Sequence, residues 1–233
     1  MIHDPVDSQA FLDVVRRPLA DGDAAALAHA VNARWTCRQV CGLLRDTAVD
    51  VRRVAAVTIG MIGDKRSVNC LARALHDRDP QVSEMAEHSL WSIWFRGGSP
   101  AATVPFSRGV AALSEERFAG AIRYFEEAIA ADPGFAEAYN QCALGHFFLG
   151  QWQAGIEDCL RAIDHMPVHF GAIAGMGHCY TQLGRMDKAL SCYQHAVRIN
   201  PRLHAISIAI ERLHTILERQ CDSSGMYDAA GIV

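Results

Sequence analysis

Hydrophobic and small residues in the second half of the chain recur at one fixed offset. The positions related by this offset include Pro133, Pro167 and Pro201; Ala128, Ala162 and Ala196; and Phe125, Cys159 and Tyr193. Within one period the small residues let two antiparallel helices approach closely, and the proline stops the second helix. A fixed period of this length predicts a solenoid, in which stacked helix pairs share one continuous core.

The length and pattern of this unit resemble the tetratricopeptide (TPR) repeat, W-x2-L-G-x2-Y followed by A-x3-F and a proline. Three such repeats fit the chain, at residues 102–135, 136–169 and 170–203. The first repeat matches least well in its leading helix, because Pro105 and Arg108 stand where Trp and Leu are expected. Residues 204–220 carry apolar side chains at helical spacing, which predicts a capping helix over the end of the solenoid.

A shorter period governs the first part of the chain: the offset that relates Asp46 to Asp77 also relates Val51 to Val82. The segment around Asp46 resembles the short HEAT-like repeat first named from phycobilin lyases, in which each unit is a helix, a tight turn and a helix. Asp79-Pro80 is a favourable helix start, with an N-cap aspartate and a proline at the first helical position. Residues 8–33 are expected to form two further helices, broken at residues 21–23.

These patterns predict an all-α protein: an α-α superhelical solenoid of short HEAT-like repeats followed by three TPR repeats and a C-terminal capping helix. The predicted order is HEAT-like repeats at 8–96, a short linker or junction at 97–104, a TPR domain with its capping helix at 105–220, and a disordered tail at 221–233. Trp91, Trp94 and Phe95 directly precede the boundary. One hydrophobic interpretation is that these aromatic side chains seal the two arrays together.

Composition narrows the function classes. The 233 residues are 50% hydrophobic and 21% charged, which is typical of a globular protein. A net charge of −4 leaves no basic footprint for nucleic acid or an anionic membrane. The aspartate-rich N-terminal stretch is wrong for a signal peptide, and no apolar run could span a bilayer. We therefore expect a cytoplasmic protein, without nucleic-acid or membrane partners, whose eight cysteines are free thiols.

Candidate chemistry is sparse. The chain has no GxSxG, Walker A, GxGxxG or HExxH motif, so we expect no catalysis and no cofactor. Cys142 and His146 lie four apart on one helix face, and Cys159 falls on the partner helix; together they could hold zinc. The favoured alternative is that all three fill core positions, because free cysteine is among the most buried residue types. Adjacent His178 and Cys179 point in different directions, which argues against a nucleophilic pair.

The TPR resemblance implies that the first helix of each repeat lines a concave face. The residues that map to this groove are Phe106, Val110, Leu113, Asn140, Leu144, Phe147, Phe148, Ala174, His178 and Gln182. TPR domains that clamp the carboxylate of chaperone tails resemble one another in a set of Lys, Asn and Arg residues. The matching positions here hold Phe106, Val110, Gln141, Gly171 and Gly175, so that clamp is absent.

A mostly apolar groove suits an amphipathic helix or an apolar extended peptide. We therefore expect a non-catalytic scaffold or adaptor for a protein or peptide partner. Three alternatives stay open: the groove is filled by the protein itself, it is filled by a second copy in a homodimer, or the chain is an enzyme or chromophore-handling factor, as the HEAT-like resemblance implies. The glycine-rich stretch around Gly171 and Gly175 is compatible either with close helix packing or with a groove that admits another backbone.

Overall fold

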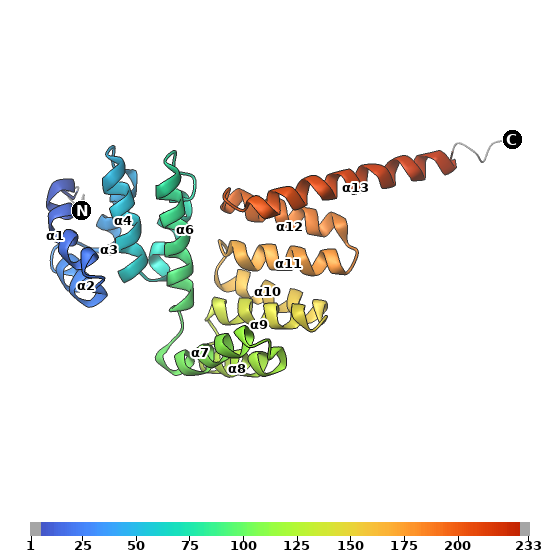
Figure 1. Ribbon diagram of the computed structural model, residues 1–233, viewed down its shortest axis with the longest axis horizontal. Helices are drawn as coiled ribbons and strands as arrows, with labels where there is room; N and C mark the ends of the chain where they lie inside the picture. The colour runs from blue at the N-terminus through green and yellow to red at the C-terminus, as the bar shows by residue number, and fades with distance from the viewer. Residues whose placement is uncertain (1–5, 229–233) are drawn as a thin grey trace. The chain divides into compact units, whose positions relative to one another are not determined.

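The computed structural model describes residues 6–228 and the side chains of residues 6–219. Within that range the chain is all-helical, with thirteen α-helices and two short 3-10 helices packed in consecutive pairs (Figure 1). The predicted fold class is therefore confirmed. The chain divides into two compact units, one ending at Gly97 and the next beginning at Gly98. We call these unit 1 and unit 2 and describe each by itself.

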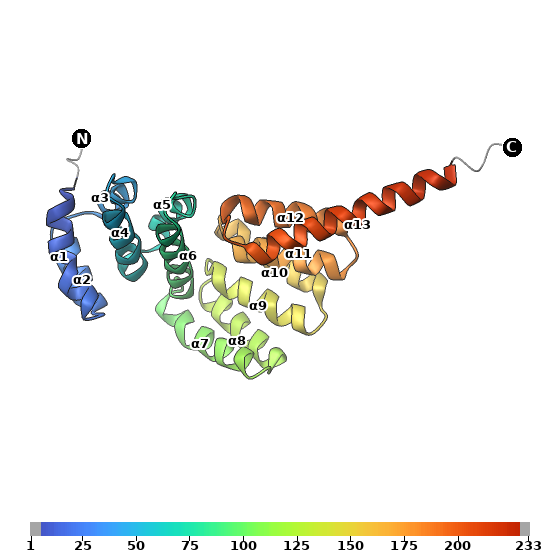
Figure 2. The ribbon, with the colours of Figure 1, turned by 45° about the horizontal axis from the view of Figure 1, so that its top comes forward.

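Unit 1 is an array of short helices. Its elements are α1 (Ser8–Ala20), α2 (Ala24–Asn32), α3 (Cys37–Gly42), η1 (Leu43–Arg45), α4 (Val49–Ile62), η2 (Lys65–Ser67), α5 (Val68–Ala74) and α6 (Pro80–Phe95). The start of α5 follows the start of α3 by the same offset that relates Asp46 to Asp77, and α6 follows α4 by that offset too. The long helices α4 and α6 pack side by side, as both ribbon views show (Figure 2). The shorter period seen in the sequence is thus a structural repeat.

The helix starts in unit 1 follow local capping chemistry. Asp7, Asp23 and Asp79 each accept a hydrogen bond from a backbone N–H in the first turn of the helix that follows, and Pro80 occupies the first turn of α6. Thr36 and Gln39 form a reciprocal capping box on α3. The predicted break at residues 21–23 and the predicted start at Asp79-Pro80 are both confirmed.

Unit 2 consists of three helix pairs and a last helix. The pairs are α7 (Pro100–Ser114) with α8 (Phe118–Ala131), α9 (Ala136–Phe148) with α10 (Trp152–His165), and α11 (Phe170–Gln182) with α12 (Met186–Ile199). Helix α13 (His204–Asp228) follows and packs on α12, with Ile206 and Leu213 buried. This is the predicted capping helix.

Two boundaries differ from the sequence prediction. The sequence assigns residues 100–104 to the linker, but they form the start of α7, because Ser99-Pro100 places a proline in the first helical turn and Pro105 is accommodated inside the helix. The sequence also assigns residues 221–228 to a disordered tail, whereas they continue helix α13; residues 229–233 lie outside the described range. The predicted sealing of the two arrays by Trp91, Trp94 and Phe95 stays a prediction.

Close contacts between glycine and aromatic rings organise the core of unit 2. A Cβ atom at Gly109 would lie 2.5 Å from Phe125 Cε1, and one at Gly177 would lie 2.5 Å from Tyr193 Cε1. Each glycine belongs to the first helix of its repeat, and each ring belongs to the second. The absent side chain is what lets the ring lie against the backbone of the facing helix.

In the middle repeat, the contact between the first and the second helix is made by smaller side chains. Ala143 and Cys159 stand at the positions that Gly109 and Phe125 hold one period earlier, and both are buried. A larger residue on one helix thus accompanies a smaller one on the other, which conserves the volume between them.

Candidate functional site

The groove residues predicted from the sequence separate into covered and accessible groups. Phe106 is only 4% exposed and contacts the Phe125 and Phe135 rings, with centroids 5.7 and 4.6 Å away. Ala174, at the equivalent position of the third repeat, is 8% exposed. Their assignment to the groove is wrong, because both side chains belong to the core.

The equivalent residue of the middle repeat is partly covered as well. Asn140 is half-buried, and its amide donates a hydrogen bond to Glu137 Oε1 at 3.2 Å. Side chains at this early position of the first helices therefore face the neighbouring helices. Val110 and Leu113, further along α7, are half-buried and pack against the same core as Phe106. Any accessible groove begins in the C-terminal halves of the first helices.

Helix α9 presents the largest exposed apolar side chains among the predicted groove residues. Phe148 is 54% exposed and Leu144 is 38% exposed, while Phe147 is half-buried. The Phe148 ring stacks on Phe118 of α8, with centroids 4.8 Å apart and an interplanar angle of 18°. Phe147 lies edge-on to Phe148, at a centroid distance of 5.8 Å. The stacking holds Phe148 in place while half of its surface stays open.

Helix α11 continues this row. His178 is exposed, and its ring centroid lies 6.3 Å from that of Phe147. Its Nδ1 atom is hydrogen-bonded to the Tyr193 hydroxyl at 2.8 Å, and partial desolvation lowers the pKa of His178. Gln182 is exposed one turn further along the same helix. We call the surface formed by Leu144, Phe147, Phe148, His178 and Gln182 the α9–α11 face.

A buried hydrogen-bonded pair at the N-terminal ends of α9 and α11 was not predicted from the sequence. Glu137 and His169 have fully buried side chains, and Glu137 Oε2 lies 2.7 Å from His169 Nε2. Gln141 donates a hydrogen bond to the other carboxylate oxygen at 2.6 Å, and His169 Nδ1 accepts one from the backbone N–H of Ala172 at 3.2 Å. Because Nδ1 accepts, Nε2 carries the proton and donates it to Glu137. This network joins the second repeat to the third.

The three potential zinc ligands that the structure brings together differ in one residue from the set predicted from the sequence. Cys142, His146 and Asp158 bring their ligand atoms within 4.8 Å of one another, at the interface of α9 and α10. Cys159, which the sequence reasoning places in this set, lies elsewhere: its Sγ is 3.5 Å from a Cβ built at Gly175 of α11. One residue along α10 turns the side chain by about 100°, so Asp158 faces α9 and Cys159 faces α11.

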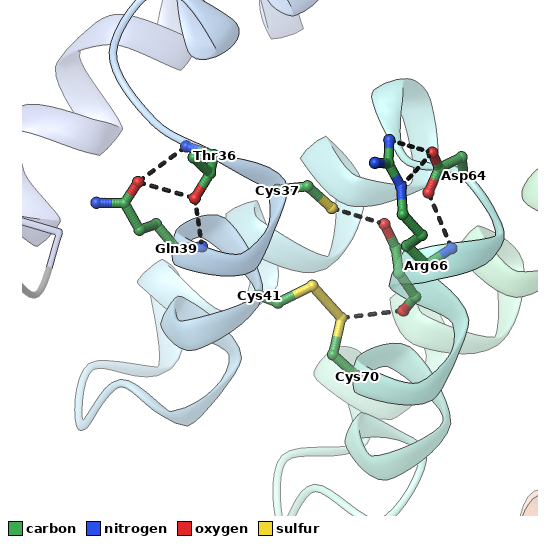
Figure 3. The surroundings of a disulfide bond; sticks show 8 residues. Thr36, Cys37, Gln39, Cys41, Asp64, Arg66 and Cys70 are labelled. Carbon is green, nitrogen blue, oxygen red and sulfur yellow. Dashed lines mark hydrogen bonds and ion pairs between the residues drawn. A yellow bond between two sulfur atoms is a disulfide. The ribbon is translucent and has the colours of Figure 1, made fainter. Parts of the chain in front are cut away.

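Unit 1 contains a disulfide that contradicts the expectation of eight free thiols. Cys41 of α3 and Cys70 of α5 are bonded, with Cα atoms 5.9 Å apart (Figure 3). Cys37, which precedes Cys41 by one helical turn, is free and lies 3.0 Å from Ser67 Oγ. The bond links two consecutive repeats of the shorter period within unit 1. Neither the spacing along one helix nor a CxxC motif could therefore reveal it.

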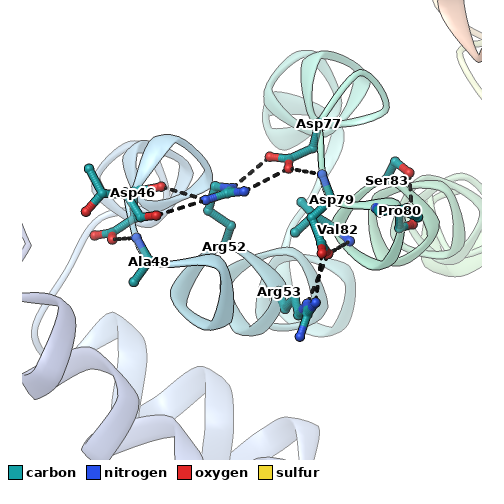
Figure 4. Close-up of polar contacts among 10 residues, drawn as sticks. Asp46, Ala48, Arg52, Arg53, Asp77, Asp79, Pro80, Val82 and Ser83 are labelled. Atoms are coloured by element: carbon teal, nitrogen blue, oxygen red, sulfur yellow. Dashed lines mark hydrogen bonds and ion pairs between the residues drawn. The ribbon is translucent and has the colours of Figure 1, made fainter.

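Arginines of α4 link consecutive loops of unit 1. Arg52 binds both carboxylate oxygens of Asp77, at 2.8 and 2.9 Å, and donates to the Asp46 carbonyl at 3.0 Å (Figure 4). Arg53 binds both oxygens of Asp79, at 3.0 and 2.8 Å. The hydrogen bonds from Arg52 hold the pKa of Asp77 below its usual range. Asp77 and Asp79 are therefore occupied by structural ion pairs.

A pocket of about 810 Å³ lies beside these ion pairs, lined among others by Cys41, Asp46, Arg52, Cys70 and Asp77. Two of its charged residues, Arg52 and Asp77, are paired with each other, and its two cysteines are joined as a disulfide. The pocket shows no activated nucleophile among the described residues, and we place the candidate site on unit 2.

Unit 2 is thus a solenoid of antiparallel helix pairs with an accessible aromatic face on its first helices. Residues 172–203, which lie within its third repeat, match the family model of the tetratricopeptide repeat. A TPR repeat-containing protein of Rhizobium etli is 26% identical over 143 residues, which are 61% of this chain and 69% of that protein.

Solved structures show the same fold. The first TPR domain of Spaghetti (RPAP3), bound to the HSP90 peptide SRMEEVD, is 18% identical with a TM-score of 0.51, over 52% of this chain and 95% of that one. The Sgt2 TPR domain of Aspergillus fumigatus is 18% identical with a TM-score of 0.51, over 54% of this chain and 84% of that one. No helix within residues 6–228 is long and apolar enough to cross a membrane.

Proposed function

We propose that this chain is a non-catalytic adaptor that binds an apolar segment of a partner protein on the α9–α11 face. The observation that carries the proposal is the pair Phe147 and Phe148. An aromatic side chain that is 54% exposed, yet held by stacking on Phe118, is preorganised for contact at little cost in side-chain entropy. Exposed aromatic groups with apolar neighbours are typical of binding surfaces.

The partner is better described as apolar than as acidic. The Spaghetti domain is bound to SRMEEVD, a peptide with three acidic residues. In this chain the positions of the chaperone clamp carry no Lys or Arg, and Phe106 among them is buried. The α9–α11 face offers aromatic and aliphatic side chains, one histidine with a lowered pKa and one glutamine. Such a face favours an amphipathic helix or an apolar extended segment.

A homodimer in which two copies cover each other's α9–α11 face is the alternative that the same exposed residues support. We further propose that unit 1 is a HEAT-like array and that the protein works in the cytoplasm. The HEAT-like assignment is supported by the shorter structural period and by the ion pairs between consecutive repeats of unit 1. Disulfide bonds are uncommon in the cytoplasm. Whether Cys41 and Cys70 are bonded in the cell therefore tests the proposed cytoplasmic location.

Peptide selection on the purified full chain tests the proposal. A random peptide library displayed on phage should yield binders rich in Leu, Phe, Trp and Met, whereas the synthetic peptide SRMEEVD should not bind. The variant Phe148→Glu should lose the selected peptides, because their binding would bury an unpaired charge at a cost of several kcal/mol. Its melting temperature should change little, since position 148 remains half open to water.

Leu160→Glu is the matched control. Leu160 is 45% exposed on α10, the second helix of the same repeat, and lies outside the α9–α11 face. This variant should bind the selected peptides like the wild type. Selection of acidic peptides, or equal loss in both variants, would contradict the proposal. Sedimentation of wild type and Phe148→Glu separates the homodimer alternative, because only a dimer through this face would dissociate in the variant.

A further inference from the structure

Three potential metal ligands meet inside the second repeat, apart from the α9–α11 face. Cys142 and His146 come from α9 and Asp158 comes from α10, and their ligand atoms lie within 4.8 Å of one another. Cys142 is 2% exposed, and the side chains of His146 and Asp158 are 17% and 21% exposed. The thiol of Cys142 faces the Asp158 carboxylate. The cluster is therefore largely shielded from bulk water.

The other repeats do not place these residue types at the same positions. One period later, Met176, Tyr180 and Cys192 correspond to Cys142, His146 and Asp158. One period earlier the residues are Arg108, Ala112 and Tyr124. The helix pair can thus form without a histidine and a carboxylate at its interface. The polar set is a property of the second repeat and is not needed for the fold.

The hydrogen bonds around His146 leave one of its nitrogens aimed at a carboxylate oxygen. Gln151 Oε1 lies 2.6 Å from His146 Nδ1, so Nδ1 carries the proton and donates it. In the neutral ring, Nε2 then presents a lone pair toward Asp158 Oδ2, 3.6 Å away. That oxygen is buried and accepts no hydrogen bond within the described residues. A proton or a metal cation between these two atoms would satisfy both, and the nearby Cys142 thiol supplies a third ligand for a metal.

We propose that Cys142, His146 and Asp158 form a site for a thiophilic divalent cation, with Zn²⁺ as the best match. Zinc takes thiolate, imidazole and carboxylate ligands in a tetrahedron, with bonds of about 2.0–2.3 Å. In such a tetrahedron, nitrogen and oxygen ligands are about 3.3 Å apart, close to the separation of Nε2 and Oδ2. The hydrogen bond from Nδ1 to Gln151 is the kind of outer contact that fixes the ring of a metal-binding histidine.

Three protein ligands leave the fourth position open to water or to an atom of a partner. This inference does not rest on the proposed adaptor function, because none of the three ligands belongs to the α9–α11 face.

Titration of the metal-free full chain with Co²⁺ and Zn²⁺ tests the site. One equivalent of Co²⁺ should produce a thiolate-to-metal charge-transfer band together with the visible bands of a tetrahedral complex. One equivalent of Zn²⁺ should abolish both. Cys142→Ser should lose the charge-transfer band, and Asp158→Asn should weaken Zn²⁺ binding by more than roughly tenfold, since even loss of an outer partner costs that much. Gln151→Leu should weaken binding by about tenfold.

Two controls match these variants. Cys159→Ser removes the adjacent buried cysteine, and Asp164→Asn removes an exposed carboxylate of the same helix; both should bind Co²⁺ like the wild type. Absence of a tetrahedral Co²⁺ spectrum from the wild type would overturn the proposal, as would a spectrum that survives Cys142→Ser or Asp158→Asn.

A measurement on the wild type alone covers the case in which a variant fails to fold. Zn²⁺ should raise the melting temperature and slow alkylation of Cys142, followed by peptide mass spectrometry, while alkylation of Cys192 keeps its rate. Equal protection of the two cysteines, or none, would contradict the site.

Discussion

The two units build stacked helix pairs with different means of holding one layer to the next. In unit 1 the layers are joined by charged and covalent links: Arg52 to Asp77, Arg53 to Asp79, and the disulfide Cys41–Cys70. In unit 2 successive repeats are joined mainly by close packing: a Cβ at Gly145 of α9 would lie 2.8 Å from Ile122 of α8, and one at Gly155 of α10 would lie 3.1 Å from Cys179 of α11. The hydrogen bonds of His169 with Glu137 and Ala172 add a single polar link between α9 and α11.

Helix length explains the difference. In the repeats of unit 1 the first helices, α3 and α5, have 6 and 7 residues, whereas α9 and α11 of unit 2 have 13 each. A shorter helix buries less apolar surface, and the hydrophobic contribution is roughly proportional to buried area. Strong polar and covalent links compensate in unit 1. In unit 2 the longer helices make packing of small against larger side chains the main link.

Removing the disulfide should have the largest effect on stability. The bond joins cysteines separated by 29 residues, and Cys41→Ser with Cys70→Ser should cost about 3–4 kcal/mol. Hydrogen exchange with mass spectrometry should show the loss in peptides of unit 1 and not in those of unit 2. Reductant should affect the wild type in the same way and leave the double variant unchanged. Thiol counting without reductant should find six of the eight cysteines; eight would show that the bond is absent in solution.

Two glycines on the same helix should respond in opposite directions. Gly177→Ala places a Cβ 2.5 Å from the Tyr193 ring and should destabilise unit 2 by about 1–3 kcal/mol through overpacking. Gly175→Ala meets only Cys159 Sγ at 3.5 Å, an ordinary contact, and should stabilise by up to about 1 kcal/mol through helix propensity. Urea unfolding of both variants measures the difference. Equal effects would contradict close packing of Tyr193 on Gly177.

Asp77→Asn should cost about 1–2 kcal/mol, because it breaks a charge-assisted pair that keeps slight solvent contact. Arg52 lowers the folded-state pKa of Asp77, so the contribution is present above the unfolded pKa of about 3.9 and is lost as the pH falls through the folded value. The difference from the wild type, measured by urea unfolding, should therefore vanish in acid. Asp50→Asn is the control: its side chain is 83% exposed, and its loss should cost less than about 1 kcal/mol.

Periodicity predicts the helix pairs of both units because each pair repeats one set of local contacts. It fails where a contact is peculiar to one repeat. The glycines and proline of residues 96–104 indicate a linker, but Pro100 lies in the first turn of α7 and starts that helix. Phe106 maps to the groove by analogy of position, but its ring packs against those of Phe125 and Phe135 and is buried.

Links between repeats are the least predictable features. Cys41 pairs with Cys70 across 29 residues, and Glu137 of α9 pairs across 32 residues with His169, the N-cap residue of α11. Such pairs depend on how one layer is rotated on the next, which a one-dimensional pattern does not encode. The shared spacing of Asp46 and Asp77 is a usable signal for Arg52, because both positions supply an acceptor to the same guanidinium.

We propose that a partner protein docks on Phe147 and Phe148 of α9. A photo-activated phenylalanine analogue at position 148 preserves the stacking on Phe118 and reports contact directly in cells. It should cross-link to one defined partner, or to a second copy of the chain, whereas the same analogue at Leu160, similarly exposed on α10, should not. No cross-link from position 148, or the same products from both positions, would contradict the account.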